Sequence, residues 1–164
     1  MRRIYLAGPT VFLPDKLARG RALKALCESF GCHGLFPLDA DMGPTPDARR
    51  IYAVCVGMLL DSDAVVADLS PFRGPHVDDG TAFELGFAAA RGIPIFGYAD
   101  DLRPLTDRIA PRAPGERTDR DGIDIEDFGE PFNAMIVGAL AKPPFPTPRD
   151  AIAAAAQALL NRRI

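Results

Sequence analysis

The sequence predicts an α/β fold in which a parallel sheet is covered by helices on both faces. Two observations lead to this prediction. Short apolar runs, each typical of a buried strand, alternate along the chain with longer segments of helical periodicity. The apolar runs end at Gly, Pro or Asp, where a chain commonly leaves a strand and turns. Regular alternation of strand and helix is typical of parallel strands joined by helical crossovers.

The first half of the chain contains two strands and two helices by these criteria. In order, they are a strand over 3–7, a helix over 14–30, a strand over 32–38 and a helix from 47 to about 60. Gly31 ends the first helix, and Asp47 is placed to cap the second. Residues 40–46 are rich in Pro, Gly and Asp, which predicts a loop.

The second half continues the alternation and then becomes less regular. The predicted elements are a strand over 64–67, a helix over 80–91, a strand over 93–98, and helices over 102–109, 132–140 and 149–161. The strand over 64–67 ends on Asp68, and Asp78 or Asp79 is placed to cap the next helix. Residues 110–129 carry prolines, glycines and many charges, which predicts a mobile surface loop.

Length and charge restrict the classes of protein that fit. A chain of 164 residues is expected to form one domain over 1–164, large enough to bury a core without disulfides or metals. The formal net charge is −3, and the basic residues are scattered or mixed with acids. Because no basic stripe is available to pair with phosphates, binding to a nucleic-acid polymer is not expected.

Cysteine content and hydropathy indicate a cytoplasmic protein. Cys27, Cys32 and Cys55 are too few and too irregularly spaced for a disulfide framework or a zinc site, so we expect reduced thiols. No apolar run approaches the ~20 residues that cross a bilayer. The N-terminus enters a strand directly, without the apolar segment of a signal peptide. We therefore expect no membrane contact.

Glu84 is the most unusual charged residue of the pattern. It lies between Phe83 and Leu85, about one turn into the helix that follows the strand over 64–67. A carboxylate near a helix N-terminus, at the carboxyl edge of a parallel sheet, lies where such sheets bind ligands. The pattern is equally typical of a surface glutamate that stabilises the helix N-terminus, and both interpretations stay open at this point.

Missing motifs exclude several common kinds of site. The chain has no GxGxxG motif after a strand, no GxxxxGK[ST] motif and no GxSxG around Ser70. His33 and His76 lie far apart, without cysteines or carboxylates at ligand spacing, so neither a metal nor another cofactor is expected. What remains is a set of carboxylates and a hydroxyl at strand ends: Tyr5, Asp39, Asp68, Asp78 and Glu84. Such a set suits glycosidic-bond chemistry, in which one carboxylate attacks the anomeric carbon.

The chain resembles the nucleoside 2-deoxyribosyltransferases over most of its length. The matching motifs are IYLAGP at 4–9, FPLD at 36–39, ADLSPFRGPHVDDGTAFELGFA at 67–88 and FNAMI at 132–136. The resemblance implies a flavodoxin-like three-layer fold with a doubly wound parallel sheet of about five strands. It also implies base exchange between 2′-deoxynucleosides and free nucleobases, without a cofactor, as in nucleotide salvage.

The resemblance implies a role for each residue that matches a family motif. Glu84 would be the nucleophile that forms a covalent deoxyribosyl intermediate, and Tyr5 would hydrogen-bond Glu84 and hold its orientation. Asp78 would accept a hydrogen bond from a sugar hydroxyl, although a simple helix cap also explains it. Asn133 would reach into a neighbouring subunit to bind the 5′-hydroxyl, and Met135 would lie against the nucleophile and sugar. The protein would then be at least a dimer.

One position departs from the family. Many members carry Asp or Asn where this chain has Cys55, and a thiol hydrogen-bonds a base less well. We therefore hypothesise that Asp68 protonates the leaving base. The remaining residues expected to bind substrate are Gly8 and Pro9 of the first motif, with Phe12, Phe36, Asp39 and Phe72 around the base.

Two other functions compete with base exchange. A 2′-deoxynucleoside 5′-monophosphate N-glycosidase has a similar scaffold, but such enzymes tend to carry Ser where this chain has Asp78, whose charge repels a phosphate. Arg73 is the residue that would favour a phosphate. A non-catalytic nucleotide-binding domain is the other alternative, since a fold does not determine a function. Water is also expected to compete with the acceptor base, which would give slow nucleoside hydrolysis.

Overall fold

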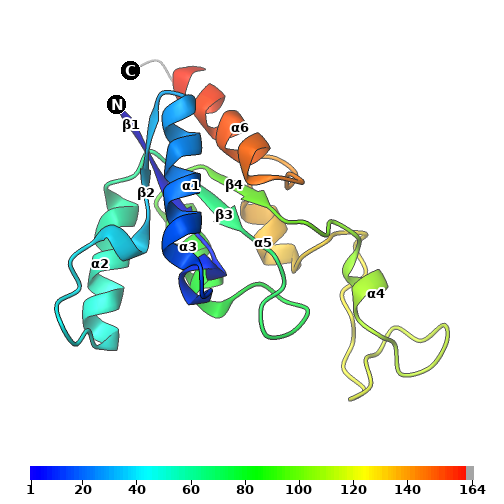
Figure 1. Cartoon of the computed structure of the whole chain (residues 1–164). Coiled ribbons are helices and arrows are strands. Elements are labelled where there is room, and N and C mark those ends of the chain that lie inside the picture. Colours follow the sequence, from blue (N-terminus) through cyan, green and yellow to red (C-terminus); the bar gives the residue numbers. More distant parts are fainter. Residues whose placement is uncertain (162–164) are drawn as a thin grey trace.

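The computed structural model describes residues 1–161 and contains a four-stranded, wholly parallel sheet (Figure 1). The strands are β1 (Arg2–Ala7), β2 (Cys32–Leu35), β3 (Ala64–Asp68) and β4 (Ile95–Tyr98), in the order β2-β1-β3-β4. The helices are α1 (Lys16–Ser29), α2 (Ala48–Leu60), α3 (Asp79–Ala90), α4 (Leu105–Arg108), α5 (Ala134–Ala139) and α6 (Pro148–Asn161). Two short 3₁₀ turns, η1 (Pro9–Phe12) and η2 (Pro37–Asp39), follow β1 and β2. The predicted α/β class is confirmed.

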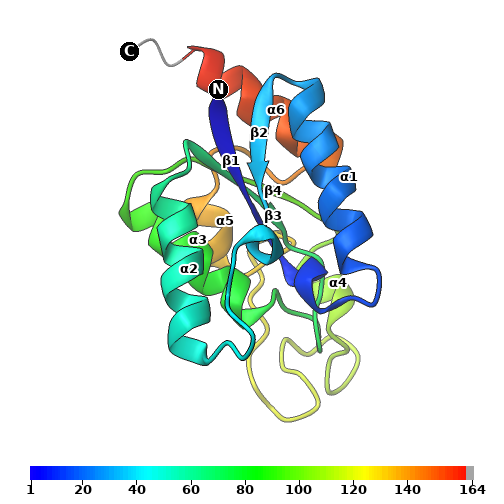
Figure 2. The ribbon, with the colours of Figure 1, turned by 60° about the vertical axis from the view of Figure 1, so that its left-hand side comes forward.

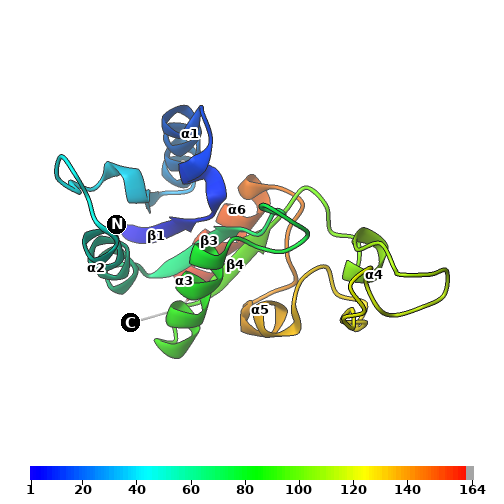
Figure 3. The same ribbon diagram turned by 90° about the horizontal axis from the view of Figure 1, so that it is seen from below.

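Helices cover both faces of the sheet, which makes three layers. Helices α1 and α6 pack on one face, and α2, α3 and α5 pack on the other (Figure 3). The predicted doubly wound arrangement is therefore confirmed. All strands run in one direction, so their carboxyl ends meet at a single edge, toward η1, η2 and α4 (Figure 2).

The prediction of about five strands is wrong by one. The fifth position, beside β4, is occupied by a bridge of one residue between Tyr98 and Phe145. Phe145 N donates to Gly97 O at 2.9 Å, and Ala99 N donates to Phe145 O at 3.0 Å. Prolines stand at 143, 144 and 146, on both sides of this residue. Because proline has no N–H to donate, the segment cannot extend the ladder.

Proline and capping residues also explain why several elements are shorter than predicted. Strand β2 ends at Leu35, because Pro37 begins η2. Pro104 precedes α4, so that helix spans only Leu105–Arg108. The side chain of Asn133 caps α5, which begins at Ala134. Asp47 and Asp78 cap α2 and α3 by accepting from the backbone N of Arg50 and of Thr81, as their positions predicted.

Alternation along the central strands decides which face each side chain reaches. Tyr5 packs in the core under α2, α3 and α5, whereas its neighbours Ile4 and Leu6 pack in the core under α1 and α6. In β3, Ala67 belongs to the Tyr5 side and Val66 to the opposite side. The same alternation directs Asp68, the last residue of β3, toward the α1 face.

The segment between β4 and α5 extends from the carboxyl edge of the sheet (Figures 1 and 3). Apart from α4 it is irregular, with isolated bridges joining Pro111 to Asp119 and Thr118 to Asp124. The segment over 110–129 is therefore a surface loop, as predicted, and its mobility stays a prediction. Within residues 1–161, no helix combines the length and hydropathy needed to cross a membrane.

Candidate active site

The centre of the site is a hydrogen bond between β1 and α3. Tyr5 is fully buried, and its hydroxyl donates to Glu84 Oε1 at 2.5 Å. Glu84 lies in the second turn of α3, on the side that faces the sheet. Among the described residues, no donor forms a hydrogen bond with Glu84 Oε2. Within the same residues, every fully buried side-chain oxygen has a hydrogen-bond partner, so an oxygen without one is accessible to solvent. Oε2 is therefore an unpaired carboxylate oxygen that solvent or a ligand can reach.

The electrostatics of this pair follow from its burial. Burial raises the pKa of Glu84 to about 7, the hydrogen bond from Tyr5 opposes the rise, and the charge of Asp78 adds to it. Burial and the charge of Glu84 raise the pKa of Tyr5 far above its ordinary range, so Tyr5 remains a hydrogen-bond donor. Above neutral pH, Glu84 is a poorly solvated anion held through one oxygen.

A cavity of about 330 Å³ opens beside Glu84 at the carboxyl edge of the sheet. Its lining residues are Gly8, Val11, Phe12, Pro37, Leu38, Met42, Ile51, Cys55, Asp78, Gly80, Thr81 and Glu84. A second cavity of about 280 Å³ between α2 and α3 shares Ile51, Cys55, Gly80 and Glu84 with it. The two acids lie on the α3 side, and the rest of the lining is mostly apolar. This arrangement suits a ligand with a polar sugar and a flat, less polar base.

Asp78 both caps α3 and lines the cavity. Its Oδ2 accepts from Thr81 N at 2.9 Å and from Thr81 Oγ1 at 3.1 Å. Oδ2 therefore holds the helix end, while Oδ1 remains for a ligand, so the two explanations of this residue are compatible. Thr81 itself is only 2% exposed and was missed in the sequence. Its position three residues after a capping Asp was the available signal.

Two aromatic rings and an arginine cluster at the mouth of the cavity. Phe12, which lines the cavity, stacks on Phe72 with 5.1 Å between ring centroids. The guanidinium of Arg73 lies 4.8 Å from the Phe72 ring centroid and 5.6 Å from that of Phe12. Arg73 adopts a left-handed backbone conformation, with φ of 53°, in the loop after β3. Of the two rings expected around the base, Phe12 lines the cavity, and Phe72 packs against Phe12.

Gly8 is required where β1 passes β3. Its φ is 141°, and a Cβ atom at this position would lie 2.7 Å from Asp68 Cβ. Any side chain here would therefore collide with Asp68 of β3. Pro9, by contrast, is buried in η1 and does not line the cavity.

Three residues expected at the site lie elsewhere. Asp68 lies toward the α1 face, where its charged neighbours are Asp100 and Arg19, and burial raises its pKa. Phe36 is 2% exposed in the core under α1, and its ring fills the space above Gly20. Asp39 pairs with Lys24 Nζ at 2.6 Å on the α1 side. None of the three lines the Glu84 cavity, so the structure gives no support for proton transfer by Asp68 or for contact of Phe36 and Asp39 with the base.

Cys55 occupies the wall of the cavity that α2 provides. It is half-buried, it lies beside Tyr5 and Glu84, and burial raises the pKa of its thiol. A protonated thiol here makes the α2 wall nearly apolar, together with Ile51. The apolar wall residues Val11, Leu38, Met42 and Ile51 were missed, because an apolar lining residue and a core residue look alike in a sequence.

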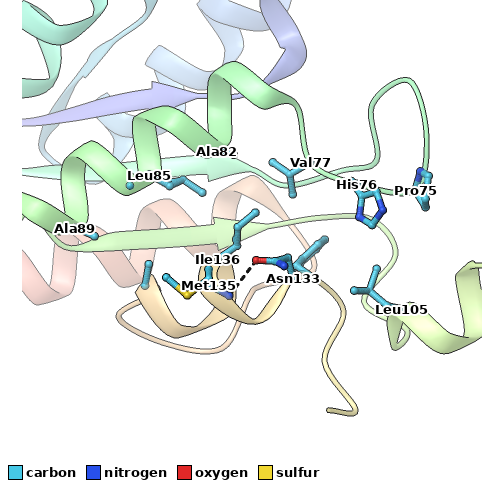
Figure 4. A pocket seen from close by; sticks show the side chains of 13 residues that line it. Pro75, His76, Val77, Ala82, Leu85, Ala89, Leu105, Asn133, Met135 and Ile136 are labelled. Carbon is cyan, nitrogen blue, oxygen red and sulfur yellow. Dashed lines mark hydrogen bonds between the residues drawn. The ribbon is translucent and has the colours of Figure 1, made fainter. Parts of the chain in front are cut away.

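Asn133 and Met135 do not join Glu84 within one chain. They line a separate cavity of about 620 Å³ between α3 and α5 (Figure 4). The side chain of Asn133 points toward the first turn of α5, where its Oδ1 accepts from Met135 N at 3.0 Å. Met135 is 82% exposed. Both residues therefore lie at the surface of α5, on the opposite side of α3 from the Glu84 cavity.

Residues 1–161 contain no group of three or more His, Cys, Asp or Glu side chains placed to hold a metal ion.

The chain is similar to known proteins over most of its length. The model of the family described as nucleoside 2-deoxyribosyltransferase matches residues 4–135. An uncharacterized protein of Schizosaccharomyces pombe is 31% identical over 158 residues, which cover 82% of this chain and 75% of the yeast protein. A 2-desoxiribosyltransferase of Leishmania mexicana superimposes with a TM-score of 0.83 at 35% identity, over 96% of this chain and 98% of that one.

A second solved structure shows the fold alone. The 2-deoxyribosyltransferase of Bacillus psychrosaccharolyticus superimposes with a TM-score of 0.60 at 19% identity, over 92% of this chain and 90% of its own.

Proposed function

The chain belongs to the nucleoside 2-deoxyribosyltransferase family, and we propose that it exchanges the bases of 2′-deoxynucleosides through a covalent intermediate on Glu84. The observation that carries this proposal is the buried Tyr5–Glu84 pair, which leaves one carboxylate oxygen free beside a cavity. The substrates would be 2′-deoxynucleosides and free nucleobases, as in nucleotide salvage in the cytoplasm.

In the first half of the reaction, Glu84 Oε2 attacks C1′ of the deoxyribose. The C1′–N bond breaks, its electron pair leaves with the base nitrogen, and the released base takes up a proton from solvent. The product is an ester between Glu84 and C1′. Burial favours this step because a poorly solvated carboxylate is a stronger nucleophile, and Tyr5 keeps the other oxygen in place.

In the second half, a nitrogen of another base attacks C1′ from the vacated side. The C1′–Oε2 bond breaks, the carboxylate is restored, and the incoming base loses a proton. Two inversions give net retention of configuration. When water attacks in place of a base, the same intermediate is hydrolysed. The mostly apolar lining favours a flat base over water.

Asp78 favours an uncharged 5′ end over a phosphate. Its Oδ1 would accept a hydrogen bond from a sugar hydroxyl, while Oδ2 remains on Thr81. Two like charges ~4 Å apart repel by roughly 1–4 kcal/mol at a protein surface. A 5′-monophosphate is therefore disfavoured close to Asp78, which argues for transfer between nucleosides over cleavage of nucleotides.

The site would be completed by a second copy of the chain. Met135 is 82% exposed, and the cavity that it lines with Asn133 lies outside the Glu84 cavity. In an oligomer, Asn133 would bind the 5′-hydroxyl in the neighbouring site and Met135 would lie against the sugar. The enzyme would thus be an obligate dimer or a larger assembly.

The direct test is chromatography of 2′-deoxyinosine, adenine and enzyme. Appearance of 2′-deoxyadenosine supports transfer, and its loss in Glu84→Ala supports the assigned nucleophile. Release of deoxyribose without 2′-deoxyadenosine would instead indicate a hydrolase. Binding of the nucleoside without either product would indicate a non-catalytic domain.

A further inference from the structure

Glu126 holds the start of α5 through both of its carboxylate oxygens. Asn133 Nδ2 donates to Glu126 Oε1 at 2.7 Å, and the backbone N of Ala134 donates to Glu126 Oε2 at 2.9 Å. Glu126 and Asn133 also line a common cavity of about 290 Å³. Hydrogen bonds to an ionised acceptor are stronger than those between neutral groups. The irregular segment before α5 thus holds the side chain of Asn133 through Glu126.

The contacts determine which way the Asn133 amide faces. A carboxylate only accepts and a backbone N–H only donates, so Nδ2 lies toward Glu126 and Oδ1 toward Met135 N. Nδ2 carries a second hydrogen, and Oδ1 has a second lone pair. Asn133 therefore keeps one donor and one acceptor, which together match a hydroxyl group.

Other contacts fix the segments that carry these two residues. Arg108 of α4 donates to the carbonyl oxygen of Pro131, and its guanidinium lies 5.5 Å from the Phe132 ring centroid. The side chain of Ile125 is buried, and its backbone N donates to Arg117 O at 2.8 Å. The residues next to Glu126 and next to Asn133 are therefore anchored separately, and Glu126 joins the two segments.

We infer that Glu126 is a positioning residue that orients Asn133 to bind the 5′-hydroxyl of a 2′-deoxynucleoside in the neighbouring subunit's site. The inference rests on the proposed function, because Asn133 meets a substrate only if the chain exchanges deoxyribosyl groups as an oligomer. The long irregular segment between β4 and α5 would then have a function, because it places Glu126 at the start of α5.

The test is a double-mutant cycle with two donors. Glu126→Gln, Asn133→Ala and the double variant are assayed for base exchange with adenine, using 2′-deoxyinosine and 2′,5′-dideoxyinosine. Glutamine cannot accept both hydrogen bonds, so we expect Glu126→Gln to lower kcat/KM about tenfold for 2′-deoxyinosine. The donor without a 5′-hydroxyl should react equally well with the wild type and with Glu126→Gln. The double variant should lose no more than Asn133→Ala alone.

Glu116→Gln is the matched control, because Glu116 lies in the same segment and its carboxylate accepts from the Thr118 hydroxyl at 3.1 Å. It should leave both donors unaffected. Equal losses on both donors, or additive losses in the double variant, would overturn the role of Glu126. If Glu126→Gln does not fold, Glu126→Asp replaces it, with the same comparison of donors. No exchange by the wild type with either donor would overturn the proposed function, and this inference with it.

Discussion

The hydroxyl of Tyr5 lies 2.5 Å from Oε1 of Glu84, a contact between residues 79 positions apart in the sequence. Tyr5 comes from the central strand β1 and Glu84 from α3, so packing of the sheet against that helix sets the distance. The distance between the pair therefore depends on the packing of the core. The geometry of the pair leads to the first two predictions.

Tyr5→Phe should keep the packing and remove the hydrogen bond. Because that bond lowers the pKa of Glu84, its loss should move the ascending limb of kcat/KM from about pH 7 to higher pH. We expect a fall in kcat of about tenfold or more, as for loss of a hydrogen bond to a charged group. Tyr52→Phe, at an exposed tyrosine of α2, is the control. An unchanged pH profile in Tyr5→Phe would contradict this role.

Glu84→Gln should stabilise the protein at alkaline pH. Burial raises the pKa of Glu84 from 4.5 to about 7, so ionisation costs folding free energy. The stability that the protonated group contributes is fully present below pH 4.5 and is lost as the pH rises through about 7. At pH 8 the variant should gain up to about 3 kcal/mol in free energy of unfolding. At pH 4.5 it should gain little.

Urea denaturation of both proteins at the two pH values measures this difference. Glu116→Gln, which changes an exposed glutamate, should show no comparable gain. A Glu84→Gln variant that is less stable than the wild type at pH 8 would show that Glu84 is not destabilised by burial.

Asp68→Asn and Asp78→Asn should differ sharply in base exchange. Asp68 lies toward the α1 face, so its variant should retain exchange within about twofold, a change expected for a residue outside the site. Asp78 lines the cavity, and Asn caps a helix as well as Asp does, so its variant removes charge while keeping α3. We expect kcat/KM of Asp78→Asn to fall about tenfold or more. A large loss in Asp68→Asn would restore it as the proton donor.

Mixing Glu84→Ala with Asn133→Ala should raise base exchange above that of either variant alone if neighbouring chains complete each other's sites. Glu84→Ala lacks the nucleophile, and Asn133→Ala lacks the group that would come from the partner. After unfolding and refolding together in equal amounts, a dimer should regain about a quarter of the wild-type sites, since half of the dimers are mixed and each has one intact site. Each variant refolded alone is the control. No gain on mixing would show that one chain supplies both residues to its own site.

Sequence patterns predicted the local structure well, because strand alternation, caps and breakers act over a few residues. The pattern drew attention to Glu84, one turn into a helix after a strand, and to Asp78 at its cap, but only the family resemblance assigned them roles. The face of the sheet that each side chain reaches was harder to predict. Asp68 ends the correct strand, but the alternation of β3 directs it toward α1, which the motif alone does not reveal.

Residues whose role depends on distant partners were the least predictable. Phe36 looked like a base-binding aromatic, yet it fills the space above Gly20, sixteen positions earlier in the chain. The predicted number of strands was too high by one, because the prolines around Phe145 limit the fifth position to a bridge of one residue. These prolines are visible in the sequence. Glu126 went unnoticed, because only the fold brings its loop to Asn133.

The central claim is that a carboxylate oxygen of Glu84 bonds to C1′ during turnover. The most direct measurement is mass spectrometry of the protein quenched with acid after mixing with 2′-deoxyinosine and no acceptor base. We predict a mass increase of one deoxyribosyl group, located on the peptide that contains Glu84 and missing in Glu84→Ala. A deoxyribosyl group on another residue, or unmodified protein at every quench time while exchange proceeds, would contradict the account.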